Sequence, residues 1–291
     1  MLWWALGTVA LWILFNAKTS RPDGKLVAVH PYRKMLGYIM PGRNESVCYY
    51  DDFVRAEPLL AYLEEAGPAI GANMTHCLVA AMGITLEKNP KLNTFVSGRR
   101  FYRRNERTVT FSMKRKKLDK EAKLSAVKLS LEDGQSFADL CARINAEVNK
   151  ERSGEKTYAD KEFDLFTPIP RAILEWMVRL VFKLDYYNLL PKSFIENDGM
   201  FSSCFIANLG SINMKPAYHH LFEWGNCPLF MMVGKVEERA LVEDGEVKVV
   251  KVIPMRWSFD ERIDDGLSAS FGMNMVREVL ENPREHLGAP S

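Results

Sequence analysis

The first fifteen residues carry no charged side chain, and this run constrains the chain most strongly because it has to be kept out of water. A helix of that length rises about 22 Å, less than the roughly 30 Å hydrocarbon core of a bilayer. Asn16 and Ala17 lengthen the helix, and the long side chains of Lys18 and Arg21 reach toward the headgroups. Tryptophans of the kind found in an interfacial belt lie in the run at Trp3, Trp4 and Trp12. We therefore predict a membrane-anchor helix over residues 1–17, with burial of that helix in an oligomer as the alternative.

Positive charge follows the apolar run, whereas a cleaved signal peptide carries it before the run. Lys18, Arg21 and Lys25 place the body of the protein on the cytoplasmic side of the membrane by the positive-inside rule. We expect residues 18–29 to be a linker, residues 30–287 to form one domain and residues 288–291 to be a tail.

The composition is that of a folded protein. With 291 residues and 47% apolar side chains, the chain can bury one large core or two small ones. The formal net charge is only +2, so no general field attracts the protein to nucleic acid. The five cysteines form no C-x-x-C pair, which favours reduced thiols over a disulfide framework and gives no support to a structural zinc site.

Helical and strand patterns share the body of the chain. Apolar spacing, proline positions and caps predict helices at 58–65, 74–88, 136–148 and 267–280. Alternating or continuous apolar runs predict strands at 94–101, 108–113, 126–131, 229–235 and 247–253.

One of these junctions has a distinctive sequence. Residues 257–268 read W-S-F-D-E-R-I-D-D-G-L-S. They resemble the signature of the chloramphenicol acetyltransferase and dihydrolipoamide acyltransferase superfamily, in which a strand ends in S-F/Y-D-H-R and a D/N-G pair soon opens a helix. The family histidine is the general base that takes a proton from the acyl acceptor. Glu261 holds its place here, while Arg262, Asp265 and Gly266 fit the pattern.

A second match lies upstream, where residues 201–211 read F-S-S-C-F-I-A-N-L-G-S. This segment is similar to the family's F-T-I-(S/T)-(S/N)-L-G strand and turn, whose first Ser or Thr donates a hydrogen bond to the oxyanion of the intermediate. Ala207 occupies that position, and Asn208 fits the next one.

The resemblance extends from about Pro31 to Leu287 and includes the P-K-L-N-T-F run that begins at Pro90. It implies an α/β fold: a chloramphenicol acetyltransferase-like two-layer sandwich of mixed sheet and helices, here following the N-terminal hydrophobic helix. It also implies a homotrimer or larger shell, with the active site and the coenzyme A channel formed between subunits.

The two replacements weaken the family's chemistry. An ordinary Glu is about four pKa units weaker as a base than the thiolate it would have to generate, which is roughly 5 to 6 kcal/mol uphill. Loss of one oxyanion donor costs about 2.7 to 4 kcal/mol in other enzymes. We therefore expect a membrane-anchored, non-catalytic scaffold or partner-binding component. The alternative is a coenzyme-A-dependent acyltransferase that uses Glu261 as its base.

Three histidines in the middle of the chain are candidate replacement bases, namely His76, His219 and His220. His219 and His220 are neighbours in a loop, a setting in which histidines are more often solvated than catalytic. Metal binding by this pair has no further ligand at a recognisable spacing.

Residues 163–191 are expected to be a helical insertion specific to this branch of the family. From Arg171 onward, charges at four-residue steps form a narrow stripe on an otherwise apolar helix, at Arg171, Glu175, Arg179 and Lys183. So wide an apolar face predicts cover by a neighbouring subunit, by a membrane surface, or by a protein partner on residues 171–184.

Arginines between residues 99 and 107, followed by Lys114–Lys117, form a basic patch. We interpret it as a charged rim that faces lipid headgroups or the phosphates of coenzyme A, in preference to nucleic acid.

Overall fold

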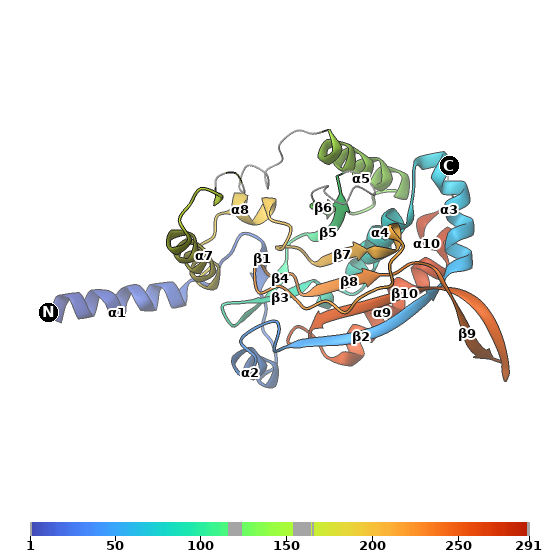
Figure 1. Cartoon of the computed structure of the whole chain (residues 1–291). Helices are drawn as coiled ribbons and strands as arrows, with labels where there is room; N and C mark the ends of the chain where they lie inside the picture. The colour runs from blue at the N-terminus through green and yellow to red at the C-terminus, as the bar shows by residue number, and fades with distance from the viewer. Residues whose placement is uncertain (1, 116–123, 154–163, 165, 290–291) are drawn as a thin grey trace.

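The structure is a computed structural model, and it describes residues 2–115, 124–153, 164 and 166–289. A large mixed sheet crosses the molecule, with long helices against one face and a smaller sheet beside it (Figure 1). The predicted α/β class is confirmed. Residues 163 and 165 of the predicted insertion, Lys116 and Lys117 of the basic patch, and residues 290–291 of the predicted tail lie outside the described residues.

The large sheet has the strand order β2-β10-β8-β7-β5-β6, and β9 pairs with the first half of β10. The pairs β5–β7 and β7–β8 are parallel, whereas β10 runs antiparallel to β8. β7 and β10 therefore run in opposite directions, and their carboxyl ends lie at opposite ends of the strands of the sheet. The strands span Val47–Arg55 (β2), Arg107–Lys114 (β5), Leu124–Leu131 (β6), Cys204–Asn208 (β7), Leu229–Val233 (β8), Glu237–Glu243 (β9) and Glu246–Asp260 (β10).

Long helices bury one face of this sheet. On β5 the side chains alternate, so that Val109 and Phe111 enter the core while Thr108 and Thr110 face the other side. The helices on the core side are α3 (Ala56–Ile70), α4 (Met74–Lys88), α5 (Phe137–Arg152) and α9 (Gly266–Glu281), which confirm the four predicted helices. Short elements complete this part of the chain: α2 (Pro31–Ile39), η1 (Pro90–Asn93), α8 (Lys192–Asn197), η2 (Leu209–Ile212) and α10 (Pro283–Leu287).

The predicted single strand over residues 94–101 is wrong. The segment folds as a hairpin of β3 (Thr94–Ser97) and β4 (Arg100–Arg104). Both residues of the turn have positive φ, +55° at Gly98 and +61° at Arg99, as a two-residue hairpin turn requires. The pattern misses the turn because Arg99 lacks the usual preference for that conformation.

The predicted linker over residues 18–29 is also wrong. Gly24–Leu26 forms strand β1, which pairs with β4 and completes a three-stranded sheet in the order β1-β4-β3. Arg21 does not reach toward a membrane, since its side chain is 1% exposed and its guanidinium pairs with Asp23 at 2.6 Å and with Asp185 at 3.0 Å. The segment is folded into the domain because it supplies a strand and a buried ion pair.

The N-terminal helix α1 spans Leu2–Ala17 and projects from the body (Figure 1). Its large apolar side chains from Trp3 to Phe15 are exposed, and they include Trp3 at 84%, Trp4 at 82% and Trp12 at 61%. Among the described residues, no single helix has both the length and the apolar character needed to cross a bilayer. The bent pair Ala56–Ile70 and Met74–Lys88 passes that test together, but these are α3 and α4, which contribute to the core.

Helix α7 spans Arg171–Tyr186, and none of its residues is buried. Its carboxyl end packs against the β3–β4 hairpin, where Ser97 Oγ donates to Asp185 Oδ2 at 2.9 Å. The predicted helix from Arg171 is confirmed. Its exposed large apolar side chains are Ile173, Trp176, Leu180, Phe182 and Tyr186.

Candidate active site

Glu261 lies in the turn directly after β10. The last residue of that strand, Asp260, pairs with Val47 on β2, and the backbone amide of Glu261 donates to Ser46 O at 2.9 Å. The Glu261 side chain is exposed. Its charge lies close enough to Cys48 to raise the pKa of that thiol, in second place after burial. The backbone fixes the position of Glu261 while its carboxylate faces solvent in the single chain.

Asp260 and Arg262, on either side of Glu261, form a buried ion pair. Arg262 donates through Nε to Asp260 Oδ1 at 2.8 Å and through Nη2 to Oδ2 at 2.6 Å. The remaining Arg262 nitrogen, Nη1, donates to the carbonyls of Met40 and Pro41 at 2.9 and 3.1 Å. Arg262 therefore fixes the turn, and all three of its guanidinium nitrogens donate to Asp260 or to these carbonyls.

Asp265 begins helix α9. Its Oδ1 accepts the backbone amide of Ser268 at 2.9 Å, the arrangement of an N-terminal cap. This hydrogen bond lowers the pKa of Asp265, and Arg33, 3.8 Å from Oδ2, adds to the effect. Asp265 has a structural role as a cap that is independent of catalysis.

Ala207 lies near the carboxyl end of β7, on the face of the sheet away from the long helices. It is buried in a small apolar cluster that includes Phe205, Phe230 and Met232. The next residue, Asn208, uses its amide for structure, since Oδ1 accepts from Ser211 N and Nδ2 donates to Thr75 Oγ1, both at 3.2 Å. No hydroxyl stands at position 207.

The two degenerate positions are far apart within one chain. Ala207 pairs with Met232 on β8, and Met232 pairs with Arg256 on β10. Glu261 is five residues beyond Arg256, which corresponds to roughly 17 Å along the strand. One chain therefore does not bring Ala207 and Glu261 together, and a common site requires a second copy of the chain.

Of the candidate histidines, His76 has a structural role inside the fold. It is buried on α4, where its ring nitrogens lie 3.2 Å from Asn73 N and 3.1 Å from Asn145 Oδ1. Burial lowers the pKa of His76.

His219 and His220 lie on the same face of the sheet as Ala207. The His219 ring stacks on Phe230 with 4.3 Å between centroids and on His220 with 4.8 Å. Ser258 on β10 donates a hydrogen bond to the carbonyl of His219. The two imidazoles thus extend an aromatic stack that begins at Phe205, whose ring lies 4.8 Å from Phe230.

The arginines of the predicted basic patch bond mostly within the chain. Arg104 donates to Asn226 Oδ1 at 2.6 Å, Arg107 pairs with Glu87 at 2.6 Å, and Arg103 donates to Thr94 Oγ1 at 3.0 Å. Arg100 donates to the backbone carbonyls of Asn16 and Lys18. These four guanidinium groups therefore bind within the chain, whereas Arg99 is exposed.

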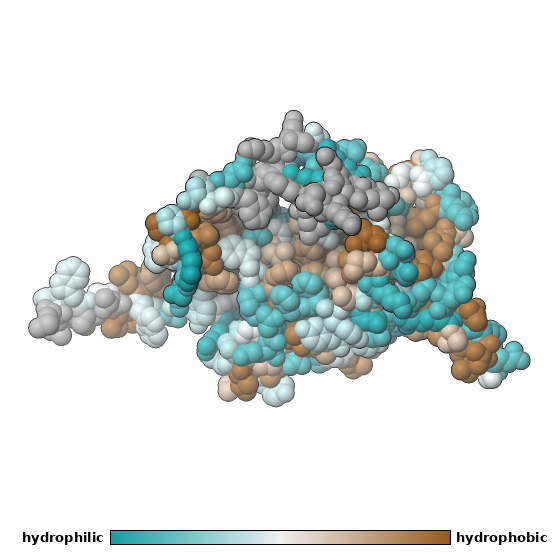
Figure 2. All heavy atoms as spheres, viewed as in Figure 1, coloured by the Kyte–Doolittle hydropathy of each residue, from teal (hydrophilic) through white to brown (hydrophobic). Residues whose placement is uncertain are grey.

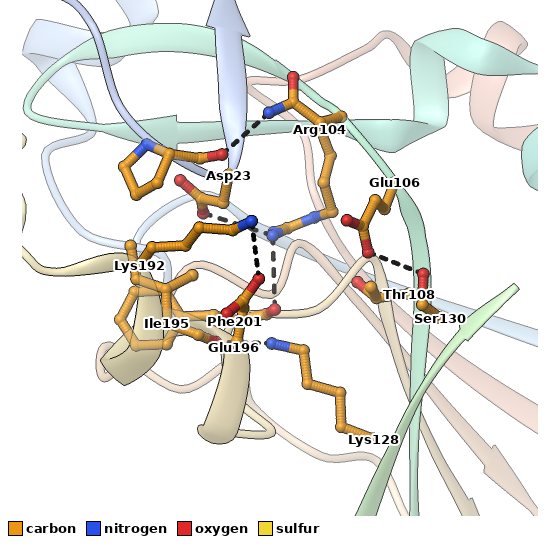
Figure 3. Close-up of a pocket in the computed structure, with 12 residues that line it drawn as sticks. Asp23, Arg104, Glu106, Thr108, Lys128, Ser130, Lys192, Ile195, Glu196 and Phe201 are labelled. Atoms are coloured by element: carbon orange, nitrogen blue, oxygen red, sulfur yellow. Dashed lines mark hydrogen bonds and ion pairs between the residues drawn. The ribbon is translucent and has the colours of Figure 1, made fainter.

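A cavity of about 270 Å³ lies between β5, β6 and α8, and no motif in the sequence predicts it (Figure 3). Lys128 on β6 lines it and donates to Ile195 O at 2.7 Å and Asp198 O at 3.2 Å. Burial lowers the pKa of Lys128 to about 8, and the charge of Arg104 adds to this. The other charged side chains in the wall have partners there: Lys192 with Glu196 at 3.2 Å, Arg104 with Asp23 at 3.4 Å, and Glu106 with Ser130 at 2.8 Å.

The signal for this cavity in the sequence is faint. Lys128 stands between Val127 and Leu129, so an alternating strand turns it away from the core. Nothing in the sequence shows that α8 closes over it. Among the described residues, no group of three or more His, Cys, Asp or Glu side chains is arranged to hold a metal ion.

Comparison with known proteins finds similarity in the carboxyl-terminal part of the chain. Residues 194–288 match the family model for the 2-oxoacid dehydrogenases acyltransferase catalytic domain. The match is confined to this carboxyl-terminal part of the chain. A dihydrolipoyllysine-residue acetyltransferase component of the pyruvate dehydrogenase complex from Bacillus subtilis is 30% identical over 86 residues, which are 28% of this chain and 18% of that protein. The chain therefore spans less than a fifth of the length of this acyltransferase relative.

Solved acyltransferase structures share the fold over most of the chain. A probable dihydrolipoamide acetyltransferase from Listeria monocytogenes has a TM-score of 0.58 and 15% identity, covering 89% of this chain and 94% of that one. The cubic core of the pyruvate dehydrogenase multienzyme complex gives 0.57 and 15%, covering 93% and 94%. A chloramphenicol acetyltransferase gives 0.53 and 11%, covering 88% and 99%. The predicted chloramphenicol acetyltransferase-like fold is confirmed.

Proposed function

We propose that this protein is a membrane-anchored, non-catalytic member of the acyltransferase fold that acts as an oligomeric scaffold or partner-binding component. The observation that carries the proposal is the turn after β10. Its structural residues remain in place, with Asp260 bonded to Arg262 and Asp265 capping α9, but the residue between them that would handle the proton is Glu261. The architecture of the site is retained while its reactive group is replaced.

The chemistry of acyl transfer supports this reading. The reaction needs a base for the acceptor thiol or hydroxyl, together with donors for the oxyanion. The side chain of Ala207 supplies no donor, and Asn208 next to it is engaged with Ser211 and Thr75. Glu261 is an exposed carboxylate in place of an imidazole. Coenzyme A and a second acyl carrier would therefore meet a site without the family's base and without its side-chain donor.

Oligomerisation is part of the proposal. The pyruvate dehydrogenase core to which this chain is similar is cubic. The distance between Ala207 and Glu261 within one chain is what a site built between subunits requires. We infer a homotrimer or a larger assembly in which the sheet face that carries Ala207 meets a neighbouring copy.

Membrane anchoring rests on α1. Its large apolar side chains from Trp3 to Phe15 are exposed, and Arg100 donates to the backbone carbonyls of Asn16 and Lys18 where the helix joins the body. With residue 1 included, the 17 residues are short for a span, so local thinning of the bilayer around the helix is part of the proposal. Lys18 and Lys25 after the helix support a cytoplasmic location for the body by the positive-inside rule, and we include that location in the proposal. Arg21, which is buried, has no part in this contact.

Restoration of the missing groups tests the scaffold proposal. The double variant Glu261→His with Ala207→Ser returns the base and the hydroxyl to a frame that keeps Arg262 and Asp265. If the protein is a scaffold, the new hydroxyl at position 207 lies among apolar side chains. We then expect acyl transfer from acetyl-coenzyme A to dihydrolipoamide to stay at the rate of the uncatalysed reaction. A wild-type protein that is already active, and loses that activity on Glu261→Gln, supports the alternative enzyme. Extraction of the full chain from membranes only by detergent tests the anchor separately.

A further inference from the structure

One side of helix α7 is apolar and exposed. Ile173 is 52% exposed, Trp176 is 63% exposed and Leu180 is 40% exposed. Figure 2 shows this apolar surface around α7, divided by a hydrophilic stripe. A helix with so much exposed apolar area is unfavourable in water, so it calls for a specific cover.

This side of α7 is continuous with α1. Ile173, Trp176, Leu180 and Tyr187 are spaced so that a period of 3.6 residues places all four on the same side of the helix. The ring of Tyr187, which follows the last turn, lies 5.8 Å from the ring of Phe15 on α1. At its carboxyl end, the exposed apolar side of α7 therefore continues through Tyr187 to Phe15 on the helix that we propose as the anchor.

The base of α1 is held firmly to the end of α7. Arg21 pairs with Asp185 at 3.0 Å and donates to Asn188 Oδ1 at 3.3 Å. Asn188 in turn donates to Lys18 O at 3.0 Å. Figure 1 shows α1 leaving the body with α7 beside its base. These bonds are buried or partly buried, so they fix the base of α1 beside the end of α7. A bilayer that holds α1 therefore lies next to α7.

The charge on α7 fits a lipid surface. The stripe next to the apolar side contains three basic residues and one acidic residue, and the acidic one is paired, with Glu175 lying 2.7 Å from Arg179. The net charge of the stripe is therefore positive. An amphipathic helix with a basic polar side lies in the interface and buries its apolar side about 5 to 10 Å into the headgroup and acyl boundary. Anionic headgroups attract such a helix further.

We propose that α7 is a second membrane contact, lying in the interface of an anionic bilayer with Ile173, Trp176 and Leu180 inserted among the lipids. This inference rests on the proposed anchoring by α1. Together the two helices fix the orientation of the body against the membrane. A single hydrophobic helix, by contrast, leaves helix and body free to turn together about the helix axis.

Tryptophan quenching tests the contact. The full chain, with Trp3, Trp4 and Trp12 replaced by Phe, is inserted into vesicles of phosphatidylcholine and phosphatidylglycerol whose acyl chains carry bromine. Bromine quenches tryptophan only at short range. Trp224 provides the matched control, since its ring packs on Phe182 at 5.5 Å and on Phe194 at 6.1 Å. We expect brominated lipid to reduce the emission, and we expect this loss to disappear on Trp176→Phe and to persist on Trp224→Phe.

The other outcomes are distinct. Quenching of Trp176 by aqueous iodide, with no effect of brominated lipid, overturns the inference while leaving the anchor intact. Protection of Trp176 from both quenchers means that a second copy of the chain covers α7, which also overturns it. If the protein fails to float with vesicles at all, the proposed anchor is wrong, and the inference falls with it.

Discussion

Asp260 and Arg262 hold each other through two hydrogen bonds of 2.6 and 2.8 Å, with their side chains 1% and 2% exposed, and Glu261 lies between them in the sequence. A buried bidentate pair of this kind fixes the backbone on both sides of the intervening residue. The position of residue 261 is therefore determined by the fold, whichever side chain stands there.

Removal of one member of this pair is expected to destabilise the protein strongly. Asp260→Asn leaves the Arg262 guanidinium buried without a counter-charge, which costs about 3 to 5 kcal/mol of unfolding free energy. Glu175→Gln is the control, because it breaks an exposed pair and costs less than about 1 kcal/mol. Urea denaturation of both variants gives the two values. Equal losses in the two variants would mean that the turn is not held by this pair.

Arg21 tests whether residues 18–29 are part of the domain. Arg21→Met removes the buried arginine that pairs with Asp185 and with Asp23. We therefore expect the unfolding free energy to fall by about 3 kcal/mol. Lys25→Met changes an exposed lysine of the same segment and serves as the control. The denaturation midpoints of the two variants are compared. If residues 18–29 were a linker, neither variant would have a lower midpoint than the wild type.

Gly98 is expected to tolerate no side chain. Its φ of +55° disfavours other residues, and a Cβ there would lie 2.1 Å from Tyr186 O, at the end of α7. Gly134 has a φ of +71° with nothing within 4 Å of a Cβ, so Gly134→Ala carries only the backbone cost of about 1 kcal/mol. Gly98→Ala should lose more stability than Gly134→Ala in thermal unfolding, and α7 should become easier to cleave by protease. A loss no greater than that of Gly134→Ala rules out the close packing of α7 on the hairpin.

Lys128 is expected to titrate near pH 8. After reductive ¹³C-methylation, the resonance that disappears in Lys128→Arg should have a midpoint of about 8. The unfolded chain keeps this proton up to about pH 10.5, whereas the folded chain releases it near pH 8. The unfolding free energy of the wild type should therefore rise with pH across that window, by up to about 3 kcal/mol relative to Lys128→Met. A midpoint near 10.5 would show that the amine is solvated.

The elements of this fold could be predicted where the pattern is local. The helices that contain Pro58, Leu78 and Leu280 follow from apolar spacing and caps, and the α/β class follows from the resemblance at residues 257–268. The hairpin at Gly98 could not be predicted, because its reason is the approach of Tyr186 from a distant helix. Arg21 looked like a membrane-facing charge for the same reason, since its partner Asp185 is 164 residues away.

The candidate site shows the same division. The replacements at Glu261 and Ala207 are legible in the sequence, because a motif names the residue expected at each position. The sequence does not predict that Arg262 is the buried partner of Asp260, and it does not predict the cavity beside Lys128. Both depend on which carbonyls and helices the fold brings together.

The rate of acyl transfer by the wild-type protein tests the central claim most directly. The 291-residue chain in vesicles is given acetyl-coenzyme A and dihydrolipoamide, and loss of the thioester is followed beside the Glu261→Gln variant. Our account predicts that both proteins match the vesicle-only rate. A wild-type rate well above that background, abolished by Glu261→Gln, would contradict it.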